Sequence, residues 1–123
     1  MNTILLVEDD ASFAEVVRKA LVSFGYEAIH AQNGRDALRL FDPKAMLVVL
    51  TDLLMPDMDG LQLIVKLQEL DPAVRIIAMT GGGRCAPDAY LPMAQRLGAV
   101  KTLAKPFPLE ELRSAVRECL DQS

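Results

Sequence analysis

Five short apolar runs, separated by stretches with helical spacing, constrain the fold of this chain more than any other feature. The runs occupy residues 4–7, 28–31, 46–50, 76–79 and 99–103. Three of them contain no polar residue, which is typical of strands that are covered on both faces of a parallel sheet. Parallel strands need long crossovers between them, and the intervals here are long enough to hold one helix each.

Apolar side chains recur at helical spacing in these intervals. The first helix is predicted across residues 13–24, with Gly25 as the residue that ends it. A shorter helix covers residues 36–41 and stops at Pro43. The last helix has Pro108 at its start, where a missing N–H group leaves no bond unmade.

The third and fourth helices are less simply placed. In the fourth, Asp88 could serve as the cap, but Pro92 would then remove an early hydrogen bond, so a start near Leu91 is preferred. The third helix ends at Asp71 and is expected to turn four side chains toward the core. These are Leu61, Ile64, Val65 and Leu70.

The sequence therefore predicts an α/β fold of the doubly wound (βα)5 type. Right-handed crossovers place helices on both faces of a five-stranded parallel sheet. At 123 residues, without repeats or linkers, the chain is expected to form a single domain across residues 1–123.

Composition excludes several classes of function. The net charge of −4 and the pI near 4.9 argue against direct nucleic-acid binding by this domain. No window approaches a membrane span, and the first residues lack the basic start of a signal peptide, so a cytoplasmic location is predicted. Cys85 and Cys119 have no partner pattern and are interpreted as reduced thiols.

Polar side chains with related chemistry follow four of the five strands. Glu8, Asp9 and Asp10 come after the first strand, and Asp52 ends the third. Thr80 ends the fourth strand. Lys105 follows the fifth. Ligands of open α/β sheets bind beyond the carboxyl ends of the strands, so these groups are expected to meet there.

This set of groups indicates phosphoryl chemistry. Clustered carboxylates repel one another unless a cation joins them, and oxygen ligands without His or Cys favour Mg²⁺, with Mn²⁺ as the alternative. A lysine and a hydroxyl would then neutralise and hydrogen-bond phosphoryl oxygens. With Asp52 as the nucleophile, the product is an aspartyl phosphate.

Four motifs then resemble response regulator receiver domains, the CheY-like modules of two-component signalling. They are "ILLVEDD", "TDLLMPDMDG", "IIAMTGG" and "LAKPF", in this order along nearly the whole chain. The resemblance implies a flavodoxin-like sheet with strand order 2-1-3-4-5. It also implies a sensor histidine kinase or histidine phosphotransfer protein as donor and an unknown downstream effector. Homodimers occur in the family.

The resemblance assigns roles by position. Asp52 would be the phosphoacceptor, Asp9 would bind Mg²⁺ directly and Glu8 mainly through water. The backbone carbonyl of Leu54 would supply a further metal ligand. Two roles remain possible for Asp10, a metal contact and a helix N-cap.

The same resemblance covers the fourth and fifth strand ends. Thr80 would bond a phosphoryl oxygen and move toward it on activation, and Lys105 would bridge to the same group. Pro106 would follow a cis peptide bond. The aromatic residue that the family carries three positions before the lysine is replaced by Thr102, so switching is expected to rely on backbone shifts of the loop 81–87 and the fourth helix.

Other polar residues are predicted to be structural. Asp57 and Asp59 are interpreted as turn residues and His30 as part of a strand. Tyr90 is open between packing on the sheet and a partner-binding face.

Three other functions remain as alternatives. They are a docking module that is never phosphorylated, a small Mg²⁺-dependent phosphatase, and a flavodoxin-like or dinucleotide-binding module. The phosphatase would need a second aspartate where Leu54 stands, and the nucleotide module would need glycines in the acidic turn after the first strand.

Overall fold

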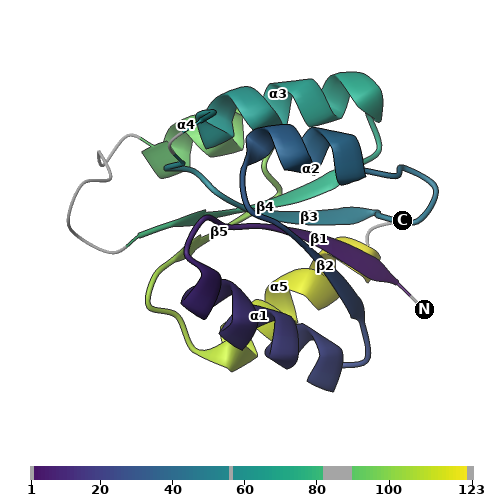
Figure 1. The fold of residues 1–123 in the computed structure, drawn as a ribbon, viewed down its shortest axis with the longest axis vertical. Coiled ribbons are helices and arrows are strands. Elements are labelled where there is room, and N and C mark those ends of the chain that lie inside the picture. The colour runs from purple at the N-terminus through teal and green to yellow at the C-terminus, as the bar shows by residue number, and fades with distance from the viewer. Residues whose placement is uncertain (1, 56, 82–89, 122–123) are drawn as a thin grey trace.

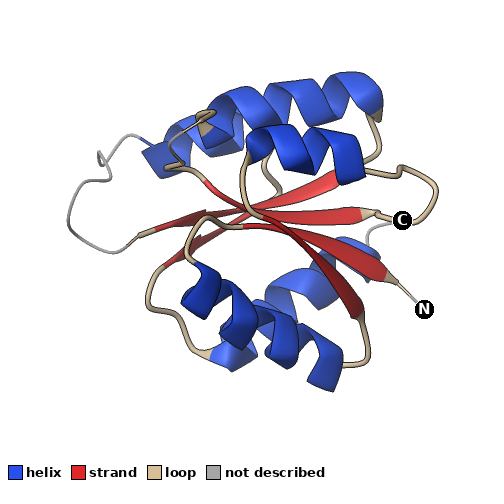
Figure 2. Ribbon diagram, viewed as in Figure 1, coloured by secondary structure: helices blue, strands red, loops and turns tan. Residues whose placement is uncertain are grey.

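Five parallel strands form one sheet at the centre of the molecule (Figures 1 and 2). The structure is a computed structural model that describes residues 2–55, 57–81 and 90–121. The strand order is β2-β1-β3-β4-β5, as the family resemblance implied. The strands are β1 (Thr3–Val7), β2 (Glu27–Ala31), β3 (Val48–Asp52), β4 (Arg75–Thr80) and β5 (Lys101–Ala104).

Five helices cover the two faces of this sheet. They are α1 (Ala11–Ser23), α2 (Gly34–Leu40), α3 (Gly60–Leu70), α4 (Tyr90–Leu97) and α5 (Leu109–Asp121). Helices α2, α3 and α4 lie on one face, and α1 and α5 lie on the other (Figure 1). The predicted (βα)5 architecture is therefore confirmed.

Side chains of the strands alternate between two cores. Leu5, Val49 and Ile76 pack beneath α2, α3 and α4, whereas Leu6 and Leu50 pack against α1 and α5. All five side chains are fully buried. Because both faces are covered, the central strands lack the polar alternation of a half-exposed sheet.

The predicted inner face of α3 was partly wrong. Val65 and Leu70 are 39% and 57% exposed, whereas Ile64 is buried and Leu61 is only partly buried. The buried residues of α3 are Gly60, Leu63, Ile64 and Leu67. These positions repeat every three and four residues, and Val65 and Leu70 lie off that stripe.

The helix ends are close to their predicted positions. Helix α1 is followed by Gly25 with a φ of 101°, the left-handed conformation that favours glycine. Helix α4 begins at Tyr90, one residue before the predicted start, so Pro92 lies in its first turn, where backbone N–H groups have no intrahelical partner. Asp88 lies outside the described residues. In the part of the chain that is described, no helix is both long and apolar enough to cross a membrane.

Cys119 lies on the inner face of α5 as a free, buried thiol. Burial raises its pKa to about 11, so the thiol stays protonated near neutral pH. Cys85 lies outside the described residues.

The register of the sheet brings the strand ends to one edge. Val7 pairs with Thr51, Asp52 pairs with Met79, and Thr80 pairs with Ala104. The residues that follow β1, β3, β4 and β5 therefore meet at this edge.

Candidate functional site

Three carboxylates converge where β1 and β3 end. One ligand oxygen from each of Glu8, Asp9 and Asp52 can be chosen so that all lie within 4.8 Å of one another. Glu8 and Asp52 are 1% and 5% exposed, whereas Asp9 faces solvent. A buried cluster of like charges needs a compensating cation.

Lys105, which follows β5, supplies positive charge to this cluster. Its Nζ lies 2.6 Å from Glu8 Oε1 and 3.2 Å from Asp52 Oδ2. Burial alone would lower the pKa of Lys105, but the hydrogen bond to Glu8 and the charge of Asp52 outweigh it and raise the pKa. The ammonium therefore stays charged and bridges the two buried carboxylates.

Glu8 is the carboxylate most affected by burial. Its pKa is raised to about 7, chiefly by desolvation and also by the charge of Asp52, although the hydrogen bond from Lys105 acts in the opposite direction. Glu8 Oε2 also accepts a hydrogen bond from the backbone N–H of Asp10, at 3.1 Å. Both oxygens of this buried side chain are thus held in place.

Thr80 ends β4 with its side chain buried at the same edge of the sheet. Its Oγ1 has no hydrogen-bond partner among the residues that the structure describes. A buried hydroxyl without a partner is costly, and this one is free to donate to a group bound at the strand ends.

The loop after β3 fixes Asp52 from the other side. Asp52 Oδ1 accepts a hydrogen bond of 3.2 Å from the backbone N–H of Leu54. The backbone carbonyl of Leu53 accepts another from the N–H of Gly60, which starts α3. The metal-ligand role of the Leu54 carbonyl stays a prediction.

Asp10 caps α1. Its side chain accepts a hydrogen bond of 3.1 Å from the backbone N–H of Phe13, so of the two alternatives the N-cap is the one that the contacts support. The Lys105–Pro106 peptide bond is cis, as the family resemblance predicted.

Contacts of two further residues were not predicted. Asp57, interpreted only as a turn residue, accepts hydrogen bonds of 3.3 Å from the backbone N–H groups of Gly34 and Arg35, so it ties the loop after β3 to the start of α2. The ring of Phe13 lies over the Lys105 ammonium, with 4.3 Å between Nζ and the ring centroid. Sequence spacing marked Phe13 only as an apolar residue of a helix.

The remaining predicted structural residues behave as expected. Asp59 is the N-cap of α3 and accepts from the backbone N–H of Leu61 at 2.8 Å. His30 Nε2 lies 2.7 Å from the backbone carbonyl oxygen of Glu8, which joins β2 to the end of β1. Thr102 is half-buried in β5. The loop 82–89 and the side chain of Tyr90 lie outside the described residues.

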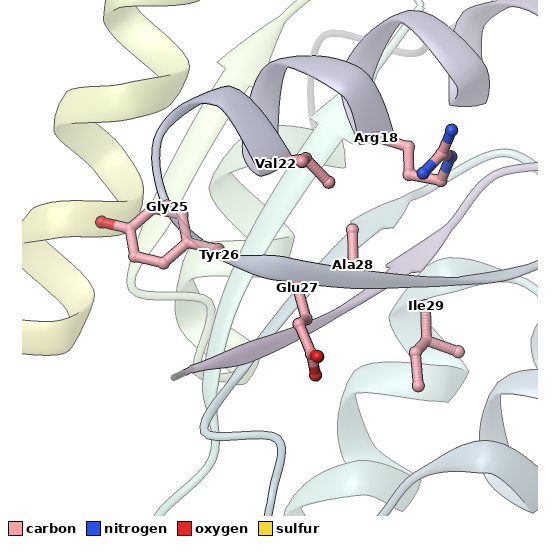
Figure 3. Close-up of a pocket in the computed structure, with 7 residues that line it drawn as sticks. All are labelled: Arg18, Val22, Gly25, Tyr26, Glu27, Ala28 and Ile29. Atoms are coloured by element: carbon pink, nitrogen blue, oxygen red, sulfur yellow. The ribbon is translucent and has the colours of Figure 1, made fainter.

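A separate pocket of about 490 Å³ lies at the edge strand β2, beside the end of α1 (Figure 3). Arg18 and Val22 of α1 and Ile29 of β2 are among the residues that line it. None of the converging carboxylates belongs to this pocket. The chemistry of the strand ends is therefore separate from it.

The metal-free protein is expected to lose stability as the pH rises from about 4.5 to about 7. Glu8 has a pKa of 4.5 when unperturbed and about 7 in the folded state, so in this interval the folded protein holds a proton that the unfolded chain has released. This contribution is fully present below pH 4.5 and is lost as the pH passes 7.

Urea midpoints measured across this pH range in the presence of a chelator would show the effect. Glu8→Gln, which cannot ionise, should flatten the profile over the same range. A wild-type profile that matches the variant would contradict the account.

Comparisons with known proteins agree with the geometry. The family model "Response regulator receiver domain" matches residues 4–117. The chain is 35% identical to the response regulator receiver protein CpdR of Brucella abortus, over 98% of both chains. It is 31% identical to sporulation initiation phosphotransferase F of Bacillus subtilis, over 95% of this chain and 92% of that protein. It also matches transcriptional regulatory protein GlrR of Escherichia coli at 33% identity, but over only 26% of that longer protein.

Solved structures show the same fold. A response regulator receiver domain protein of Clostridium thermocellum has a TM-score of 0.91 at 25% identity, covering 99% of this chain and 96% of that one. A CheY-like receiver domain protein of Methanospirillum hungatei has a TM-score of 0.90 at 27% identity, covering 99% and 95%. The chain belongs to the family of response regulator receiver domains of two-component systems.

Proposed function

We propose that this domain accepts a phosphoryl group on Asp52 from a phosphohistidine of a partner kinase or phosphotransfer protein, in a reaction that requires Mg²⁺. The observation that carries the proposal is the convergence of Glu8, Asp9 and Asp52, two of which, Glu8 and Asp52, contact the Lys105 ammonium. During transfer the P–N bond to the histidine breaks and a P–O bond to an Asp52 carboxylate oxygen forms. The histidine nitrogen takes a proton, and Asp52 becomes an acyl phosphate.

The residues at the site fit a magnesium ion. Carboxylate and carbonyl oxygens, with neither His nor Cys among the clustered side chains, are the ligands that Mg²⁺ prefers. Asp9, Asp52 and the carbonyl of Leu54 would hold the ion, with Glu8 mainly through water. When bound, the ion offsets the repulsion between carboxylates and phosphoryl oxygens.

Thr80 and Lys105 have complementary tasks toward the phosphoryl group. The Thr80 hydroxyl would donate to a phosphoryl oxygen, which gives a partner to a buried group that has none among the described residues. Lys105 already contacts Asp52 Oδ2. Its ammonium would form an ion pair with the phosphoryl oxygens once the group is attached. Both groups lie at the strand ends, at the edge of the sheet where Asp52 ends β3.

Receiver domains are signalling domains rather than conventional enzymes. For this chain we propose a single domain across residues 1–123 whose phosphorylation and dephosphorylation chemistry is intrinsic. Its kinase, its effector and its cytoplasmic location stay predictions.

Mg²⁺ is expected to stabilise the protein, and Asp9→Asn should remove most of that effect. A ligand present at 100 times its Kd stabilises the folded state by about 2.7 kcal/mol. Asp9 is exposed, so the variant should differ from wild type by less than about 0.5 kcal/mol without metal. Thermal melts with and without Mg²⁺ measure both quantities.

Asp10→Asn is the matched control, because asparagine also caps helices well. It should keep the full response to Mg²⁺. An equal loss of response in both variants would place Asp10 among the metal ligands and contradict the assignment made above.

Intact mass after incubation with acetyl phosphate and Mg²⁺ tests the proposed function. The expected result is the gain of one phosphoryl group in the presence of Mg²⁺ and no gain when Mg²⁺ is omitted. No gain under any condition would favour an unphosphorylated docking module. Rapid turnover of a phosphate monoester would favour a phosphatase.

A further inference from the structure

The Lys105 ammonium has a third neighbour besides its two carboxylates. Its Nζ lies 2.6 Å from Glu8 Oε1, 3.2 Å from Asp52 Oδ2 and 4.3 Å from the centroid of the Phe13 ring. An ammonium group carries three N–H donors. Two carboxylates and one aromatic face therefore surround it, and its side chain is only 16% exposed.

The ring of Phe13 is itself held in place. Its centroid lies 6.0 Å from that of Phe107, with the two rings almost perpendicular at 87°. This edge arrangement is the one that aromatic pairs favour. The backbone N–H of Phe13 is bonded to Asp10, which caps α1, and both rings pack against the core beneath α1 and α5.

An aromatic face suits this position for a physical reason. It attracts the ammonium through the quadrupole of the ring, most strongly where water is excluded. Unlike a third carboxylate, it adds no negative charge to a cluster that must receive a phosphoryl group. An aliphatic side chain would offer the ammonium no attractive partner beside the two carboxylates, whereas the aromatic face does.

We propose that Phe13 is a positioning residue that holds the Lys105 ammonium against Asp52. The inference rests on the proposed function, because Lys105 must be in place when the phosphoryl group arrives. Without the ring, water competes for the ammonium, and the lysine contacts Asp52 for a smaller fraction of the time. Phosphorylation should then be slower although the fold and the metal ligands are intact.

Fluorination of Phe13 tests the proposal without changing its shape. Site-specific incorporation of phenylalanines with one, two and three ring fluorines weakens the quadrupole stepwise. The rate of phosphorylation by acetyl phosphate at saturating Mg²⁺ should fall with each fluorine, to about three- to tenfold below wild type. Phe13→Leu should show a similar loss, and Phe13→Tyr, which keeps the aromatic face, should stay within about twofold.

Phe24 provides a matched control in the same protein. It lies at the other end of α1, where its ring faces the Arg113 guanidinium at 5.6 Å, away from the converging carboxylates. The same fluorinated series at position 24 should leave the phosphorylation rate unchanged. A parallel loss at both positions would show a general effect on the fold and overturn the proposal.

A second readout needs neither metal nor phosphorylation. In the metal-free protein the side-chain protons of Lys105 next to Nζ should show an upfield ring-current shift that Phe13→Leu removes. If this shift is absent and the fluorinated series reacts at the wild-type rate, Phe13 does not position Lys105. If wild-type protein gains no phosphoryl group, the proposed function fails, and the ring-current shift still decides whether the contact exists.

Discussion

Asp52→Asn is expected to abolish phosphorylation of the domain, with a loss of at least about a thousandfold in rate. The asparagine amide has nearly the same shape, so the loop after β3 should keep its course, and the hydrogen bond from the Leu54 N–H still has an acceptor. The neutral amide is a poor nucleophile and a weaker metal ligand than the carboxylate. Intact mass after treatment with acetyl phosphate and Mg²⁺ measures the loss.

The Asp52→Asn substitution should leave the stability of the metal-free protein unchanged or increase it, although it abolishes phosphorylation. Removing one of two buried carboxylates relieves repulsion with Glu8, whose pKa is raised in part by the charge of Asp52. The metal-free variant should therefore melt at or above the wild-type temperature. Asp57→Asn is the matched control, because it makes the same chemical change five residues later. This variant should accept a phosphoryl group as wild type does. A phosphoryl group on the Asp52→Asn protein would show that another residue is the acceptor.

Gly60→Ala is expected to destabilise the protein by about 2–4 kcal/mol. A Cβ at this position would lie 2.5 Å from the backbone oxygen of Asp52 and 2.5 Å from Cα of Leu53. Backbone atoms cannot turn away as a flexible side chain can, so α3 must shift from the end of β3. Because that shift moves Asp52, Mg²⁺ affinity should fall together with stability.

Gly81→Ala is the appropriate comparison for this effect. Gly81 follows β4 near the same edge of the sheet, but an added Cβ there meets no atom of the described residues within 4 Å. The free energy of unfolding of the Gly81→Ala protein should differ from that of wild type by no more than about 1 kcal/mol. Urea unfolding of both variants measures the difference, and equal midpoints would contradict the close approach of α3 to β3.

Much of the fold follows from local features of the sequence. Uninterrupted apolar runs such as residues 46–50 can only be covered on both faces, so they indicate central parallel strands with helices on each side. The inner face of α3 was less certain because Leu61 and Val65 lie next to the true stripe through Leu63 and Leu67. Apolar residues on both sides of a stripe leave the rotation of a helix undetermined until it packs.

The residue types of the site could be predicted more fully than its contacts. Strand ends meet at one edge, so Asp52, Thr80 and Lys105 were expected to lie close together. That Lys105 also bonds to Glu8 depends on side-chain geometry across the sheet. The contact of Phe13 with Lys105 is likewise a tertiary one, with no signal in local spacing.

Asp57 also makes a tertiary contact that local sequence does not predict, on the face of the sheet that α2, α3 and α4 cover. A Pro-Asp-Met-Asp-Gly sequence predicts a turn, and the side chains of Asp57 and Asp59 are equivalent at that level. In the structure Asp59 caps its own helix, whereas Asp57 reaches the N–H groups at the start of α2. Which partner an aspartate finds depends on the neighbouring element rather than on the turn.

Reductive trapping tests the central claim of this account most directly. Borohydride converts an aspartyl phosphate to homoserine, and peptide mass mapping then identifies the position. After incubation with acetyl phosphate and Mg²⁺, the account predicts homoserine at position 52 and at no other aspartate. Homoserine elsewhere, or none in protein whose fold and Mg²⁺ binding are intact, would contradict it.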